Sequence, residues 1–328
     1  MNKFTALVSR WQSNKSLMRG AVFTSSIIIV AMFFLMSSAH VMAWSEKTHM
    51  TTGAIAFEHL MATHPELMTQ IDTIIQAHPD YLVLSSHVKG LTGHARTRTL
   101  FEWLSRWADD IRETPESYPE WHYELKVVHG WTWLWPFSNG TASEAFVKNL
   151  GILSNRKAAN KDRAIALSWL MHIVGDIQQP LHAGHQITAE FPLSDEAGSL
   201  AYIRTTDLAT PVKLHEYIDS ALDSDCANSS TSDTCVEHLR KLWPPHKFEA
   251  FNDTNSVSDT FEIWLQESRL LARQDVYIGN FINASPLPNK GPVLSQEEQH
   301  NITELAKRRV AASGYRIAET IIYALVAR

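Results

Sequence analysis

Two histidine–aspartate pairs with the same spacing carry the metal chemistry that this sequence suggests. His172 lies four residues before Asp176, and His215 lies four residues before Asp219. Residues four apart on a helix share one face, so each imidazole and carboxylate could converge on one cation. Apolar neighbours would bury both pairs, which is costly unless something satisfies their polar atoms. A core histidine bonded to an aspartate would explain one pair, but two pairs favour a polynuclear metal site.

Three further segments offer ligands to the same site. Pro180 turns the chain after the first pair and presents His182 from a new direction. Asp109 closes an apolar helical pattern, whereas the next residue, Asp110, is better explained as a surface or capping residue. His122 stands between two aromatic residues. A set of nitrogen and oxygen ligands without cysteine favours zinc over manganese or iron.

The elements that must position these residues are mostly helical, because apolar residues recur at helical spacing and strand signals are scarce. We predict helices over residues 51–77 (as one helix or two), 97–112, 157–178, 207–222 (after Pro211), 259–278 and 295–327. The last of these opens with a capping-box pattern from Ser295 to Glu298. Residues 131–137, an aromatic run with a proline, and residues 184–210 are predicted loops. No linker divides the chain, so we predict one all-α domain with long loops over residues 44–328.

Residues 1–43 have the pattern of a cleavable signal peptide. Four basic and no acidic residues precede Glu46, and an apolar run over residues 21–36 leads to Val41-Met42-Ala43. This ending is typical of a signal-peptidase site, so we expect the exported chain to begin at Trp44, in the periplasm or outside the cell. The alternative is an uncleaved membrane anchor, although the apolar run is short for a membrane span.

The charge of the chain limits how it could hold a phosphate polymer. The net charge is −6 over 328 residues, and cleavage after residue 43 would make it more negative, because the removed segment has basic but no acidic residues. Proteins that grip nucleic acid through its phosphates are normally basic on the binding face. Bound cations would therefore have to supply much of the attraction. The 16 histidines suit both metal binding and proton transfer near neutral pH.

The two cysteines of the chain, Cys226 and Cys235, lie nine residues apart in a polar stretch. In an exported protein such a pair predicts one local disulfide that fixes a loop. A pair of soft metal ligands is the alternative. The spacing fits no usual zinc motif, which favours the disulfide.

Taken in order, these residues resemble the S1/P1 nuclease family, which comprises zinc-dependent, single-strand-specific nucleases related to the zinc phospholipases C. The matching positions are Trp44, His49, Trp107-Ala108-Asp109, His122, His172, Asp176, His182, His215 and Asp219. The segment from Ala312 to Ala318 also resembles the closing helix of the family. The resemblance implies a mostly helical domain with a trinuclear zinc site at the bottom of a cleft.

The resemblance also implies a ligand set for each of three zinc ions per chain. The first set is Asp109, His122, His172 and Asp176. The second set is His182, His215 and Asp219. The third set is His49, Asp176 and the amino nitrogen and carbonyl oxygen of Trp44, so Asp176 would bridge two ions. An α-amine with a pKa of about 7.7–8 is free to bind zinc only after cleavage.

The implied activity is endonucleolytic hydrolysis of single-stranded DNA and RNA to 5′-phosphate products, and an additional 3′-nucleotidase activity stays open. Asp109 would orient the attacking water or accept its proton. Tyr123 would stack on a base, for which plain packing is the alternative. Leu125 stands where the family usually has an aspartate that bonds the base edge, so the base preference stays open.

Two other functions stay open on the sequence alone. A zinc phospholipase C on the same scaffold would explain the aromatic run at residues 131–137 as a membrane contact. That relative usually has glutamate at the position of Asp219, which favours the nuclease. A non-catalytic exported zinc-binding protein would need the ligands without an open coordination position, and Asp109 argues against it. The expected partner is a single-stranded nucleic acid or a nucleotide; no stable protein partner is implied, and membrane contact is expected only for the phospholipase.

Overall fold

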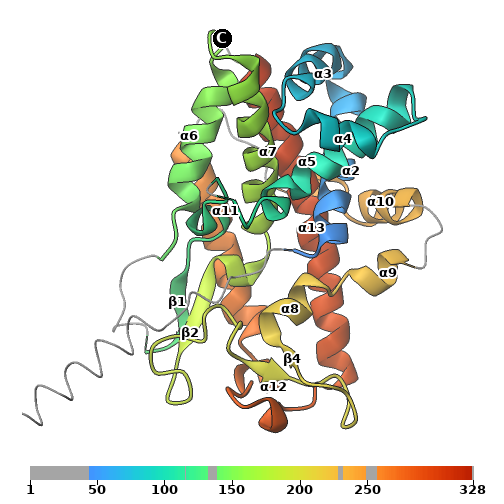
Figure 1. The fold of residues 1–328 in the computed structure, drawn as a ribbon. Coiled ribbons are helices and arrows are strands. Elements are labelled where there is room, and N and C mark those ends of the chain that lie inside the picture. Colours follow the sequence, from blue (N-terminus) through green and yellow to red (C-terminus); the bar gives the residue numbers. More distant parts are fainter. Residues whose placement is uncertain (1–43, 115, 132–138, 228–231, 249–256, 327–328) are drawn as a thin grey trace, which may run out of the picture. The chain divides into compact units, whose positions relative to one another are not determined.

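The structure analysed is a computed structural model of the chain (Figure 1). It describes residues 44–114, 116–131, 139–227, 232–248 and 257–326. The predicted signal peptide and all but Trp131 of the aromatic run lie outside the described residues. The described ranges belong to one compact unit, Val41–Arg328.

Helices make up most of this unit, as the sequence predicts. Their bounds are α2 Glu46–Thr63, α3 Met68–Gln76, α4 Tyr81–Ser86, α5 Gly93–Asp110, α6 Ala142–Ser154, α7 Asn160–Asp176, α8 Leu214–Asp219, α9 Asp223–Ala227, α10 Ser232–Leu242, α11 Val257–Leu271, α12 Gly279–Ile282 and α13 Gln296–Val326. Two short 3-10 turns, Pro119–His122 and Pro180–His182, carry candidate ligands. Among the helices of the described ranges, none is both long and apolar enough to span a bilayer.

Helix α7 lies at the centre of the packing. It contacts α5, α6 and α13, and α13 in turn runs beside α2 (Figure 1). Nearly every residue of α7 from Arg163 to Asp176 is buried, including Trp169 and Ile173. Burial of each large apolar side chain stabilises the fold by about 1.5–3 kcal/mol. The helix ends at Asp176, shortly before Pro180, whose ring cannot continue it.

Four short strands complete the fold. Strand β1, Lys126–Gly130, pairs in parallel with β2, Gly184–Ile187. Strand β3, Tyr202–Ile203, pairs antiparallel with β4, Val212–Lys213. The β1–β2 pair joins the segment after His122 to the segment after His182. Gly184 is required there, because a Cβ at this position would lie 2.9 Å from both Ala272 and Val128.

The structure confirms the helical prediction and changes some of its boundaries. Ser295 and Glu298 form the predicted capping box, with a bond in each direction. The predicted loop at residues 184–210 contains β2 and β3, and the helix expected at 207–222 is shorter. Pairing of β4 with β3 delays the start of α8 to Leu214. Helix α6 is an element that the sequence analysis missed.

Candidate metal centre

All eight predicted ligand side chains come together at one buried place. Asp109 lies near the end of α5, and His49 lies in the first turns of α2. Helix α7 contributes His172 and Asp176 from its last turns, as the four-residue spacing predicts. The two 3-10 turns contribute His122 and His182, and α8 contributes His215 and Asp219. All are buried except Asp109, whose side chain is 15% exposed, so Asp109 lies at the opening of the site.

The ligand atoms form three groups, within each of which all atoms lie within 4.8 Å of one another. The groups are His49, His172 and Asp176; Asp109, His122 and His172; and His182, His215 and Asp219. The first two groups share His172. The arrangement can therefore hold several metal ions close together.

The carboxylate of Asp176 connects the first two groups. Its Oδ1 lies 3.2 Å from His49 Nε2, and its Oδ2 lies 3.0 Å from His122 Nδ1 and 3.1 Å from His172 Nε2. The two oxygens thus face histidines from different elements. This is the geometry expected of a carboxylate that bridges two cations.

Backbone carbonyls fix which ring nitrogens point into the site. His172 Nδ1 donates to the Ser105 carbonyl (2.9 Å), His182 Nδ1 to the His122 carbonyl (2.6 Å), and His215 Nδ1 to the Ala197 carbonyl (2.7 Å). A carbonyl only accepts, so each Nδ1 carries a proton and each Nε2 faces inward, where its lone pair can bind a metal ion in place of a proton. This is how proteins orient histidines that bind a metal.

These inward nitrogens lie close to one another. His182 Nε2 is 3.2 Å from His215 Nε2, and His172 Nε2 is 3.0 Å from His122 Nδ1. Among the described residues, Asp176 Oδ1, Asp219 Oδ2 and both ring nitrogens of His49 make no well-aligned hydrogen bond, although Asp176 Oδ1 faces His49 Nε2 at 3.2 Å. Buried polar atoms without partners are costly, and a cation between them removes that cost. The residues present therefore fit a metal cluster.

The electrostatics of the ion-free cluster agree with this conclusion. Burial lowers the pKa of His172, but the carboxylates of Asp176 and Asp109 outweigh it and raise that pKa to about 10. Burial raises the pKa of Asp219 well above its usual range; the Gln179 hydrogen bond opposes this rise, and Asp176 and Asp109 add to it. The carboxylates thus favour bound positive charge in the site, which protons supply when no ion is bound and metal ions can supply instead.

Trp44 lies beside this cluster. Its indole Nε1 donates to the Gly175 carbonyl (3.0 Å), and its side chain is buried. The next amide, Ser45 N, donates to the Asp219 carbonyl (3.2 Å). The Trp44 backbone is therefore held between the residues adjoining Asp176 and the end of α8. A Cβ at position 175 would lie 3.4 Å from His49 Nδ1, an ordinary van der Waals contact, so Gly175 lies directly beside that ring.

Two functional neighbours were missed in the sequence analysis. Arg112 donates from Nε to Asp109 Oδ1 (2.9 Å), and Gln179 Nε2 donates to Asp219 Oδ1 (2.9 Å). Burial alone would raise the pKa of Asp109, but His172, His49 and Arg112 hold it well below its usual range. Their positions in the sequence could have identified both residues. Arg112 lies one helical turn after Asp109, and Gln179 follows the end of α7.

The predicted substrate residues lie just beyond the cluster. Tyr123 is half-buried and directly follows His122. Leu125 is buried in the second apolar core, and its amide and carbonyl pair with Asn139. Its side chain therefore has a packing role and leaves no polar group for a base edge. Of the aromatic run, only Trp131 lies within the described residues, and it is 42% exposed.

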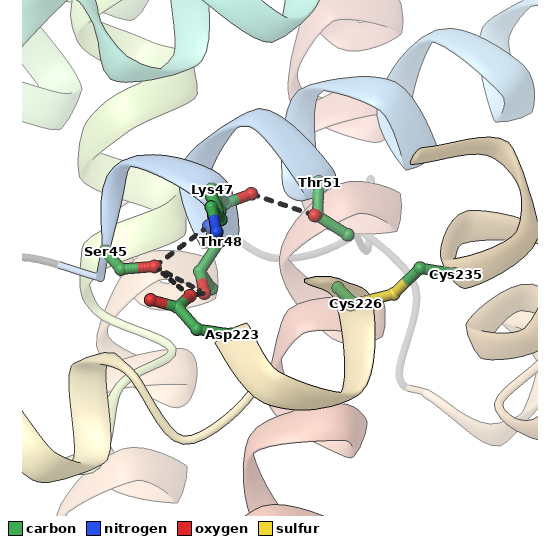
Figure 2. The surroundings of a disulfide bond; sticks show 7 residues. All are labelled: Ser45, Lys47, Thr48, Thr51, Asp223, Cys226 and Cys235. Atoms are coloured by element: carbon green, nitrogen blue, oxygen red, sulfur yellow. Dashed lines mark hydrogen bonds between the residues drawn. A yellow bond between two sulfur atoms is a disulfide. The ribbon is translucent and has the colours of Figure 1, made fainter. Parts of the chain in front are cut away.

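Cys226 and Cys235 form a disulfide, which confirms the sequence prediction and rules out these two residues as metal ligands (Figure 2). Their Cα atoms are 5.3 Å apart. The bond joins α9 to α10.

Comparison with known proteins gives a family that is consistent with this cluster of metal-binding residues. The sequence profile of the family described as S1/P1 Nuclease matches residues 44–325, which is most of the chain. A search of curated proteins found no match. The profile match begins at Trp44 and spans every residue of the metal cluster. The chain belongs to the S1/P1 nuclease family.

Proposed function

We propose that the exported chain, beginning at Trp44, is a zinc-dependent endonuclease that cleaves single-stranded DNA and RNA to 5′-phosphate products. The observation that carries the proposal is the buried ring of inward-facing imidazole nitrogens and carboxylates, with Asp109 at its opening. Family membership supplies the nucleic-acid substrate.

The three groups of ligand atoms support three zinc ions. One ion would be held by Asp109, His122, His172 and Asp176. A second would be held by His182, His215 and Asp219. The third would be held by His49, Asp176 and the amino nitrogen and carbonyl oxygen of Trp44. With both cysteines in a disulfide, the cluster offers only nitrogen and oxygen ligands, which suits zinc.

When bound, such ions supply a water of lowered pKa and neutralise charge that develops on the phosphate. Asp109 is kept ionised by His172, His49 and Arg112 and lies at the opening, so it can orient this water or accept its proton. The carbonyls of Ser105 and Ala197 keep His172 and His215 from turning during the reaction. Three divalent ions exceed the three carboxylates in charge, so the site would attract phosphate on an acidic chain.

Tyr123 supplies a flat side chain next to the cluster, on which a base can stack. Because Leu125 is buried and apolar, the chain lacks the acidic group that reads a base edge at this position. We therefore expect weak discrimination among the four bases.

The function is tested with purified, exported protein and four substrates: single-stranded DNA, single-stranded RNA, a 3′-nucleotide and phosphatidylcholine vesicles. We expect both polymers to be cleaved with phosphate on the 5′ end of each product, as read by end-labelling and mass spectrometry. Double-stranded DNA of the same sequence is the control for strand preference. Cleavage of the lipid without cleavage of any nucleotide would replace the nuclease with a phospholipase.

A further inference from the structure

The first turn of α2, beside Trp44, is held by a residue outside the metal cluster. Asp223 begins α9, and its Oδ1 accepts a hydrogen bond from Ser45 Oγ and a longer one from Thr48 Oγ1 at 3.5 Å (Figure 2). Ser45 Oγ in turn accepts from Thr48 N at 3.2 Å. The carboxylate thus fixes the residue that directly follows Trp44.

Helix α9 has five residues and is itself held by the disulfide. The Cys226–Cys235 bond joins it to α10, which packs against α2 and α13. Cys235 belongs to the same buried apolar cluster as Trp44, together with Leu222, Val236 and Leu239. The covalent link and this cluster therefore place Asp223 against α2.

The same segment connects to both ends of the metal site. Helix α8, which ends with Asp219, leads through three residues to Asp223. Ser45 N donates to the Asp219 carbonyl, and His49 N donates to the Ser45 carbonyl at 2.9 Å. Ser45 is therefore the point through which Asp223 can position both Trp44 and His49.

We propose that Asp223 and the Cys226–Cys235 disulfide form a clasp that positions Trp44 and His49, so that binding of the N-terminal metal ion depends on the oxidised disulfide. The inference rests on the proposed function, because it takes Trp44 to be a metal ligand. Asp223 is a positioning residue in this scheme and does not touch the ion.

Reduction of the clasp needs an external dithiol. One thiolate of the dithiol attacks one cysteine sulfur, forms a mixed disulfide and releases the other cysteine. The second thiolate of the dithiol then attacks the mixed disulfide and releases the first cysteine. The chain gains two thiols, and the dithiol becomes a disulfide. Thiol systems keep such cysteine pairs reduced in the cytosol, whereas exported proteins retain their disulfides. The N-terminal ion would then bind tightly only in an oxidising compartment.

The test measures zinc per chain in the exported protein after dialysis at a fixed, buffered free zinc concentration. We expect three equivalents in the wild type and two in Cys226→Ser/Cys235→Ser. Asp223→Asn keeps the disulfide and should bind the third equivalent at least tenfold more weakly, as is usual for residues that support a ligand. Asp207→Asn, which alters an exposed carboxylate, is the matched control and should keep three.

His49→Ala identifies which ion is lost. We expect it to hold two equivalents, and the cysteine double variant combined with His49→Ala to hold two as well, because both remove the same ion. Hydrogen exchange supplies a readout without metal: in apo protein, reduction should speed exchange at residues 45–49 and leave α7 unchanged.

Each outcome separates the clasp from the proposed function. Three equivalents in both the wild type and the cysteine variant, with unchanged exchange at residues 45–49, would overturn the clasp alone. Two equivalents in the oxidised wild type would overturn the third metal site and the clasp with it. Loss of two or more ions in Asp223→Asn would show a general structural role and also overturn the clasp.

Discussion

At the scale of single residues, the fully buried Asp176 lies between two groups of candidate metal ligands. Its two oxygens face three histidines from three different elements. Asp176→Asn keeps the shape but removes the charge and turns an NH₂ group toward a cation. We expect loss of at least one metal equivalent, measured by mass spectrometry of the metals. We expect kcat to fall by about 100-fold or more, since even residues behind a ligand are worth 10–100-fold.

Asp110→Asn is the control for this prediction. Asp110 is more exposed than its neighbour Asp109 and pairs with Arg106, away from the cluster. It should retain the full metal content and activity. Unchanged zinc content in Asp176→Asn would rule out a bridging role for this carboxylate.

Whether the sequence predicts a contact of the site depends on how far apart the two residues lie in the chain. The pairs His172–Asp176 and His215–Asp219 were predictable because helical spacing alone places each pair on one face. His122 was a weak candidate, because the backbone of a distant turn brings it to α7. The carbonyls of Ser105 and Ala197, which orient His172 and His215, follow no local pattern. These contacts join residues 67 and 18 positions apart, respectively, so they depend on the packing of whole elements.

At the scale of elements, the same distinction explains the fold predictions. Long helices such as α7 and α13 were predicted from apolar spacing, which is a local property. Strand β2 was missed because its partner, β1, lies far along the chain, whereas β3 pairs only with the two residues of the nearby β4. Two-residue strands also leave too short a pattern to detect.

One buried carboxyl connects the elements around β2. Asp195 Oδ1 accepts from Gln186 N at 3.2 Å, and Oδ2 accepts from Tyr277 O–H at 2.9 Å. Burial raises the pKa of Asp195 from 3.8 to about 6, although these hydrogen bonds oppose the rise. The folded state therefore binds more protons than the unfolded state between these values. The contribution of Asp195 to stability is fully present below pH 4 and is lost as pH rises through 6.

Asp195→Asn should remove this pH dependence. We expect the variant to gain stability relative to wild type between pH 4 and pH 7, on the order of 2–3 kcal/mol. Urea unfolding of both proteins at equal metal content, at pH 4.5 and pH 7, measures the difference. Parallel stability curves for the two proteins across this range would contradict a raised pKa.

A buried charge network fastens α13 and α11 to the end of α7. Arg309 donates from Nε to the Gln178 carbonyl (2.9 Å) and contacts Glu267 through Nη1 (2.7 Å). Gln178 lies two residues after Asp176. Arg309→Met should leave the Gln178 carbonyl short of a donor and remove one of the two arginines that pair with the partly exposed Glu267, which costs on the order of 1–3 kcal/mol. Urea unfolding measures this cost, and Arg308→Met, at a half-exposed neighbour, is the control.

At the scale of the whole molecule, an acidic chain surrounds a centre whose ligand atoms fit cations. The net charge is −6. General attraction of a phosphate polymer by the surface is therefore weak, and under the proposed function substrate affinity would come from the metal centre and from stacking on Tyr123. Under the proposed function the N-terminus supplies ligands to one of these ions, so its position becomes decisive.

A chain with one extra residue before Trp44 tests this dependence. The added residue turns the Trp44 amine into a peptide nitrogen, which cannot displace a proton to bind zinc near pH 7, and its own amine lies one residue too far away. We expect two zinc equivalents in place of three. The stabilisation by the third ion should also disappear, about 2.7 kcal/mol at a free zinc concentration 100 times its Kd. Proteolytic removal of the extra residue from the same preparation should restore the third equivalent and the stability, and three equivalents before removal would exclude the Trp44 amine as a ligand.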